Sequence, residues 1–239
     1  MMLILPMQRI YKFIILLVSW MLLYIAPSFS QDKVEAIGTE TEKSWYQGVK
    51  VELDVASLAI SAFSRETYSA EANVQLNIKQ KFFPVIELGF AGANKVSVKD
   101  YGFKTNGFFT RIGMDYNLLK VKEDDTSAFN KMFFIGARFA LSPFSYSMTN
   151  IVIEDDYWGE ELVLNYYDQR TTAMWFEVLA GIKVEVFKNW YMGWSLRGKM
   201  KIGKVKEGEL HPWYIPGLGI QGNASVNWAF NYTIGILFK

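Results

Sequence analysis

The feature that most constrains this chain is its C-terminal run, Val226–Lys239, in which large apolar residues alternate with small or polar ones. A β-strand projects successive side chains to opposite faces, so this alternation predicts a strand with two unlike faces. The large face carries Val226, Trp228, Phe230, Tyr232, Ile234, Ile236 and Phe238, and the other carries Asn227, Ala229, Asn231, Thr233 and Gly235. The large, aromatic-rich face indicates a barrel wall that contacts lipid.

The N-terminus has the three-part layout of a secretory signal peptide. Arg9 and Lys12 are basic, residues 13–26 are apolar and uncharged, and small residues precede the position after Ser30. The apolar run is shorter than the roughly 20 residues that a membrane-spanning helix needs. We therefore expect residues 1–30 to be a signal peptide cleaved near Ser30, with an uncleaved membrane anchor as the alternative.

The rest of the chain divides into a polar lead-in and one β domain. Residues 31–47 are polar and predict a flexible periplasmic lead-in, whereas residues 48–239 are long enough for a single barrel. Met1 and Met7 are both candidate start positions, because the segment before the basic residues is unusual for a signal peptide.

Composition excludes several classes of partner and site. The formal net charge is +1, which predicts neither a nucleic-acid partner nor a strongly acidic one. The chain has no cysteine and one histidine, which excludes disulfides, thiolate metal sites and multi-histidine metal sites. We expect no cofactor and no metal ion.

Eight segments of period-2 alternation follow one another, each near the roughly 9–11 residues that a tilted membrane strand requires. They are residues 49–60, 70–80, 85–93, 108–118, 131–141, 172–186, 190–202 and 226–239. Short links such as 188–189 alternate with long ones such as 142–170, as in outer-membrane barrels, where the short turns are periplasmic. The pattern predicts an all-β, eight-stranded antiparallel up-and-down transmembrane β-barrel. A soluble, lipocalin-like barrel is the main structural alternative.

Charged side chains share the inward phase of these strands. We expect a charge network inside the barrel formed by Glu52, Glu87, Arg111, Asp115, Arg138, Glu177, Lys183 and Arg197. The interior of an eight-stranded barrel is just wide enough for side chains, so charges buried there must pair. The prediction is a lumen plugged by paired charges, and a narrow channel is the alternative.

Aromatic residues gather near the predicted strand ends, where such side chains anchor barrels at the membrane interfaces. The set expected at the periplasmic end is Phe82, Phe83, Phe187, Trp190 and Tyr191, and the set expected at the outer end is Tyr101, Phe144, Tyr146, Tyr157, Trp158, Trp213 and Tyr214.

Taken together, residues 48–239 resemble the small outer-membrane β-barrels of Gram-negative bacteria. The signal ending Ser-Phe-Ser-Gln and the lack of cysteine are most similar to uncharacterised Bacteroidetes members of that group. The resemblance rests on pattern and implies location in the bacterial outer membrane and recognition by the barrel-assembly machinery. Such barrels usually end in an aromatic residue, whereas here Phe238 is penultimate and Lys239 is last. We expect a monomer in contact with outer-membrane lipid and lipopolysaccharide.

Three segments could carry chemistry. His211 lies in the loop before the last strand, and its position resembles that of the catalytic histidine in barrels that act on lipid acyl chains, so a lipid-modifying enzyme using loop residues near His211 is an alternative function. Residues 216–222 contain G-x-G-x-x-G, but they precede a strand rather than a helix and predict a flexible loop or strand start. The acidic loop 154–161 does not match a calcium-binding loop. We expect a non-enzymatic protein with a structural or surface-interaction role.

Overall fold

The computed structural model describes residues 46–97, 100–119, 131–154, 161–203, 211–222 and 224–238. The predicted signal peptide and nearly all of the predicted lead-in lie outside these ranges. Across the described ranges, no helix has the length and apolar character needed to cross a membrane.

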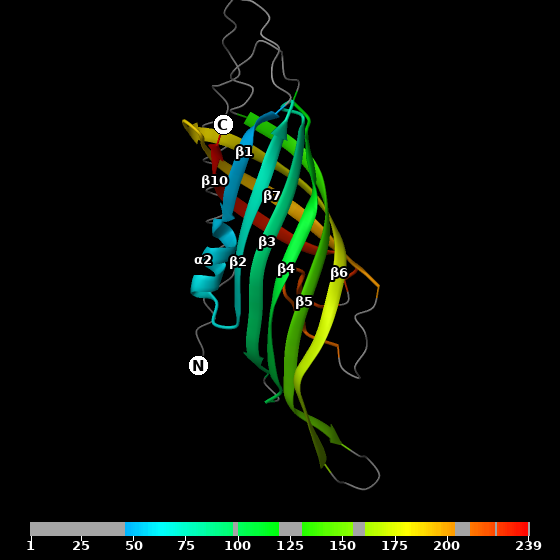
Figure 1. Ribbon diagram of the computed structural model, residues 1–239. Helices are drawn as coiled ribbons and strands as arrows, with labels where there is room; N and C mark the ends of the chain where they lie inside the picture. The colour runs from blue at the N-terminus through cyan, green and yellow to red at the C-terminus, as the bar shows by residue number, and fades with distance from the viewer. Residues whose placement is uncertain are drawn as a thin grey trace, which may run out of the picture. The chain divides into compact units, whose positions relative to one another are not determined.

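Eight antiparallel strands close into one barrel, each paired with its neighbours along the chain (Figure 1). They are β1 (Tyr46–Asp54), β2 (Thr67–Ile78), β3 (Phe82–Val96), β4 (Gly102–Asn117), β5 (Lys131–Glu154), β6 (Glu161–Phe187), β7 (Trp190–Ile202) and β10 (Asn227–Phe238). Pairing of β1 with β10 closes the ring, with Val49 opposite Phe238 and Asp54 opposite Thr233. The predicted eight-stranded up-and-down barrel is confirmed.

The two ends of the barrel differ in their connections. Tight turns join β2 to β3 and β6 to β7 at one end, here called the short-turn end, where β1 also begins and β10 ends. Asn189 in the second turn has φ +67°, the left-handed conformation that tight hairpins use. The connections from β1 to β2 and from β7 to β10 lie at the opposite end, here called the long-loop end.

Strands β5 and β6 are much longer than predicted. β5 continues to Glu154 and β6 begins at Glu161, so most of the predicted loop 142–170 is strand. β4 follows β5 only to Thr149, and β7 follows β6 only to Met174, so the β5–β6 hairpin continues past its neighbours (Figure 1). The sequence prediction was wrong here because the outward-facing apolar alternation stops after Leu141. Beyond it the apolar residues Phe144 and Tyr146 lie on the inward phase, and the runs 151–153 and 162–164 are apolar without alternation.

The first predicted strand, 49–60, was wrong beyond Asp54. Residues after it form the helix α2 (Val55–Phe63), and the Asp54 side chain caps it by accepting hydrogen bonds from Ala56 N at 3.0 Å and Ser57 N at 3.4 Å. Aspartate is among the best N-cap residues because its carboxylate satisfies the unpaired amides of the first turn. The cap therefore ends β1 and starts the helix.

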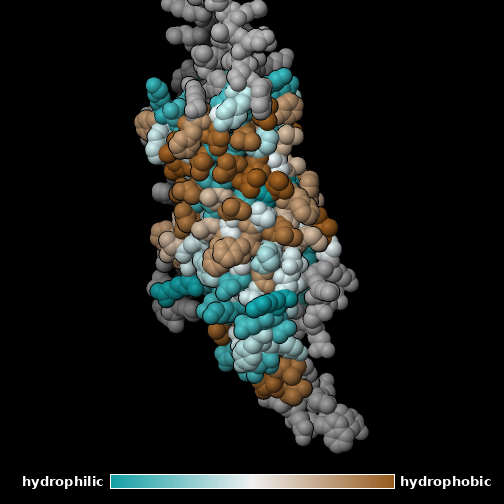
Figure 2. Space-filling model, viewed as in Figure 1, coloured by the Kyte–Doolittle hydropathy of each residue, from teal (hydrophilic) through white to brown (hydrophobic). Residues whose placement is uncertain are grey.

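The barrel carries apolar residues outside and charged residues inside. The adjacent residues Arg111 and Ile112 on β4 are 0 % and 59 % exposed, respectively. Apolar side chains from all eight strands are exposed on the outer wall, among them Leu53, Val74, Leu88, Ile112, Ile135, Val178, Leu196 and Phe230. Figure 2 shows that apolar residues dominate the visible wall toward the short-turn end, with hydrophilic residues nearer the long-loop end. This distribution is the reverse of that in a water-soluble barrel.

The predicted aromatic sets are only partly at the surface. The exposed members of the first set are Phe82, Phe187 and Trp190. The members buried inside the barrel are Phe83, Phe144, Tyr146, Tyr191 and Tyr214. The interface prediction was wrong for these five: the strand residues among them occupy the inward phase, and Tyr214 belongs to a segment folded into the barrel. Tyr157 and Trp158 lie outside the described residues.

Candidate functional site

The interior of the barrel holds the charged residues that the alternation assigned to it. The structure buries every member of the expected network: Glu52, Glu87, Arg111, Asp115, Arg138, Glu177, Lys183 and Arg197. They come from six strands. Each of these strands directs every second side chain into the lumen.

Glu87 on β3 is the centre of this network. Its Oε1 accepts a hydrogen bond from Arg138 Nε at 3.0 Å, and its Oε2 lies 2.6 Å from Arg197 Nη1 and 3.1 Å from Arg111 Nη1. One carboxylate therefore meets three guanidinium groups. Such charge-assisted contacts are stronger than neutral hydrogen bonds, especially where water is excluded.

A second acidic centre is Glu177 on β6. Its Oε1 lies 2.8 Å from Arg111 Nε, its Oε2 lies 3.2 Å from Arg197 Nη1, and Trp175 Nε1 donates to Oε1 at 2.6 Å. Arg111 also pairs with Glu71 on β2, at 2.7 Å from Nη1. Arg111 and Arg197, two of the three arginines around Glu87, thus also contact Glu177, and Arg111 contacts Glu71 as well.

The network continues toward the short-turn end. Arg138 Nη2 lies 2.6 Å from Asp115 Oδ1, and Lys183 Nζ lies 2.8 Å from Glu52 Oε2. Gln75 joins these two pairs, donating to Asp115 Oδ2 at 2.7 Å and accepting from Lys183 Nζ at 3.1 Å. Sequence reasoning missed Gln75 and Trp175 as members because it looked for charges, although both lie on the inward phase.

Little space remains among these side chains. A cavity of about 10 Å³ is bordered by the charged residues Glu52, Glu87, Asp115, Arg138, Lys183 and Arg197. This volume is at the lower limit of what holds one water molecule. The charged layer therefore fills the section of the barrel it occupies.

A hairpin from the connection between β7 and β10 enters the barrel from the long-loop end and lies next to this charged layer. It consists of β8 (Tyr214–Ile215) and β9 (Gly219–Ile220), joined by a turn at residues 216–218. The carbonyl oxygen of Gly217 accepts from Arg111 Nη2 at 3.0 Å and from Lys199 Nζ at 2.7 Å. The hairpin is therefore bound directly to the charge network.

The glycine-rich run 216–222 has a specific place: it forms the turn of the inserted hairpin and contains the start of β9, which agrees with the strand start among the two expectations. Gly217 has φ +78°, and a Cβ added there would lie 2.5 Å from the Phe109 ring. Only glycine combines this backbone conformation with so close an approach. No local pattern in the sequence indicated the contact, because Phe109 lies on β4, far away along the chain.

Apolar residues of the hairpin pack against the lumen-facing side of the wall. Its buried members are Tyr214, Ile215 and Leu218, and the cluster they join includes Phe103, Phe109, Phe144, Tyr146 and Trp175. The lumen consequently has an apolar layer next to its charged layer.

The other candidate segments show no assembled chemistry among the described residues. His211 is exposed, and Glu207 and Glu209, the acidic residues near it in sequence, lie outside the described ranges. Residues 155–160 of the acidic loop lie outside them as well. Nowhere in the described chain do three His, Asp or Glu side chains gather as a group that could hold a metal ion.

The family comparison covers nearly the whole sequence. A family model described as "Domain of unknown function (DUF6048)" matches residues 10–238. The chain belongs to this DUF6048 family. The DUF6048 match includes every strand of the barrel, and no curated protein matches the chain.

Two solved structures are similar to this DUF6048 member at low identity. Neisserial surface protein A is 15 % identical with a TM-score of 0.44, and the N-terminal β-barrel domain of Pseudomonas aeruginosa OprF is 13 % identical with a TM-score of 0.41. Each comparison covers 81 % of this chain and 99 % of the other. Neither likeness bears on function.

Proposed function

We propose that this chain is a non-enzymatic protein of the bacterial outer membrane with a structural or surface-interaction role. The observation that carries the proposal is the inverted barrel, in which Arg111 is fully buried while the neighbouring Ile112 is 59 % exposed. An exposed apolar wall of this extent is stable only against lipid, and pairing of β1 with β10 closes the ring of strands that carries it. Export by the predicted signal peptide, with cleavage near Ser30, is consistent with this location.

The interior supports a closed barrel rather than a channel. The charged layer leaves a cavity of about 10 Å³, and the hairpin 214–220 occupies part of the next section of the lumen. The proposed interactions are therefore at the surface: outer-membrane lipid and lipopolysaccharide along the wall, and the extended β5–β6 hairpin beyond it. Phe238 near the C-terminus is the residue proposed for recognition by the barrel-assembly machinery.

Fractionation of cells that express the full-length chain tests this location. We expect recovery with outer membranes and a shift in gel mobility when the detergent extract is heated, since a folded barrel resists detergent until heating. Recovery mainly as a soluble periplasmic protein would contradict the proposal.

A further inference from the structure

The barrel wall has a seam where β1 ends early. The last β1–β10 pair is Asp54 with Thr233, yet β10 remains paired with β7 as far as Asn227. On the other side, β2 remains paired with β3 as far as Thr67. Over this stretch, β2 and β10 face each other with no strand between them, and α2 occupies the space, in contact with both (Figure 1).

The two sides of the seam are joined unequally. Ser61 Oγ on α2 accepts from Ser69 N at 2.6 Å and lies 2.9 Å from Ser69 O, which replaces the contacts of a neighbouring strand. Toward β10, the hydrogen bonds come from Asp54 alone, which meets Asn231 Nδ2 and Tyr232 N. No hydrogen bond between described residues joins Val55–Phe63 to β10. Among the described residues, the line between α2 and β10 is therefore held without direct hydrogen bonds from the helix.

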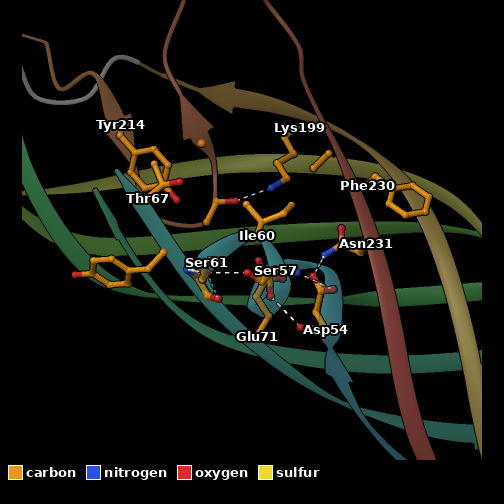
Figure 3. Close-up of a pocket in the computed structure, with 15 residues that line it drawn as sticks. Asp54, Ser57, Ile60, Ser61, Thr67, Glu71, Lys199, Tyr214, Phe230 and Asn231 are labelled. Carbon is orange, nitrogen blue, oxygen red and sulfur yellow. Dashed lines mark hydrogen bonds between the residues drawn. The ribbon is translucent and has the colours of Figure 1, made fainter. Parts of the chain in front are cut away.

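A cavity of about 170 Å³ lies behind this line, between α2, β2, β10 and the inserted hairpin (Figure 3). On its outer side are Ile60 and Phe230, which are 61 % and 50 % exposed. On its inner side are Tyr214, Lys199 and Asn231, all buried. The cavity thus leads from the apolar outer wall to polar groups inside the barrel.

Two of those inner polar groups have unused bonding capacity. Asn231 Oδ1 is buried and has no hydrogen-bond partner among the described residues. Lys199 Nζ has three N–H donors, of which one bonds Gly217 O at 2.7 Å, and it forms no ion pair with a described residue. Lys199 is attracted by the carboxylates of Glu177 and Glu71, but neither is in direct contact with it. A buried ammonium without a contacting anion and a buried acceptor without a donor are both destabilising, and a ligand that offers an anion and a donor would relieve both.

We propose that this cavity binds the phosphate-bearing head group of a membrane lipid that enters sideways between α2 and β10. Lys199 binds the phosphate, and an ammonium or hydroxyl donor of the head group meets Asn231 Oδ1. The carboxylate of Glu71 is already paired with Arg111, and that of Asp54 with the first turn of α2, which leaves Lys199 to bind the anion. The acyl chains remain outside, against the exposed Ile60 and Phe230.

This inference rests on the proposed membrane location, and its test uses the full-length chain extracted in detergent and stripped of lipid. Native mass spectrometry follows titration with phosphatidylethanolamine, with a diacylglycerol of the same acyl chains, and with inorganic phosphate. We expect saturable binding of one phosphatidylethanolamine per chain, and weaker binding of diacylglycerol.

Two substitutions examine the site independently. Lys199→Gln should weaken phosphatidylethanolamine binding by about tenfold or more, because a charge-assisted contact is lost. Lys201→Gln, on the same strand and exposed, is the matched control and should leave binding unchanged. Ala229→Phe fills the cavity without changing a charge and should block binding, whereas Ala137→Phe on the exposed wall should not.

The outcomes separate this inference from the proposed function. Equal affinity for diacylglycerol and phosphatidylethanolamine would overturn the head-group site. It would also be overturned if the Lys199→Gln and Ala229→Phe variants both bound phosphatidylethanolamine as tightly as the wild-type protein. Displacement of the lipid by inorganic phosphate at equal concentration overturns the lipid source and indicates a site for soluble anions. A protein that shows the heat-dependent mobility shift but binds no lipid refutes this inference alone, whereas loss of the shift refutes the proposed barrel.

Discussion

Removal of the positive charge of Arg138 should destabilise the barrel mainly through Asp115. Arg138 contacts two carboxylates, at 3.0 Å in Glu87 and 2.6 Å in Asp115. Glu87 keeps Arg111 and Arg197 when Arg138 is lost, whereas Asp115 keeps only the amide of Gln75. The substitution therefore leaves one buried carboxylate without a cation in direct contact.

The magnitude follows from that unpaired charge. Arg138→Met keeps most of the side-chain volume, so the cost is chiefly electrostatic, and breaking a buried ion pair from one side costs about 3–5 kcal/mol. Adding Asp115→Asn removes the stranded charge, so the double variant should be less destabilised than the sum of the two single variants. We expect a coupling energy of about 2 kcal/mol, within the range for contacting residues.

Urea unfolding of the refolded barrel in lipid vesicles measures these free energies, with heat-dependent gel mobility as a check on folding. Arg170→Met, an exposed arginine on β6, is the matched control and should change the free energy of unfolding by less than about 0.5 kcal/mol. Strict additivity of Arg138→Met and Asp115→Asn would refute the reasoning, as would a cost for Arg138→Met no larger than that of the control.

Three further predictions concern the wall, the hairpin and the loop histidine. Ile112→Arg should lower the free energy of unfolding in urea by about 2–4 kcal/mol because residue 112 faces the lipid. Asn106→Arg, on the same face of β4 but nearer the long-loop end, should leave this free energy nearly unchanged. Equal costs for the two variants would mean that the lipid boundary is misplaced. Gly217→Ala should expel the hairpin and speed its proteolysis, because its Cβ would meet Phe109, whereas Gly222→Ala has open space; equal cleavage rates would contradict the insertion. His211→Ala should leave the acyl chains of lipid A unchanged in cells that express the protein, and an altered acyl pattern that depends on His211 would favour the enzymatic alternative.

The alternation in the sequence was sufficient to predict which strand residues face inward. β10 follows the predicted phase through its length, since Asn231 and Thr233 are buried while Trp228 and Phe230 are exposed. The same rule assigned Glu87 and Arg138 to one interior. It could not predict which charges would meet. The partners of Glu87 lie on three other strands, and the position of each along the barrel axis depends on the register between strands.

Strand ends and the inserted hairpin were beyond the reach of local patterns. Apolar residues on the outward phase report contact with lipid, and this outward pattern is lost where β5 and β6 leave the apolar wall, although the strands continue. At the end of β1, alternation carries past Asp54, but the helix cap prevails over it. The hairpin depends on contacts of Gly217 with Phe109, Arg111 and Lys199, which only the closed barrel brings together.

Ion conductance of the folded wild-type protein in planar lipid bilayers tests most directly the claim of a membrane barrel with a closed interior. A charged layer with a cavity of about 10 Å³, next to an inserted hairpin, predicts insertion into the bilayer without steady conductance. Insertion has to be demonstrated in the same vesicles, by protection of the barrel from added protease. Steady, ion-selective conductance by the inserted protein would contradict the account, because it requires a continuous water path through the charge network.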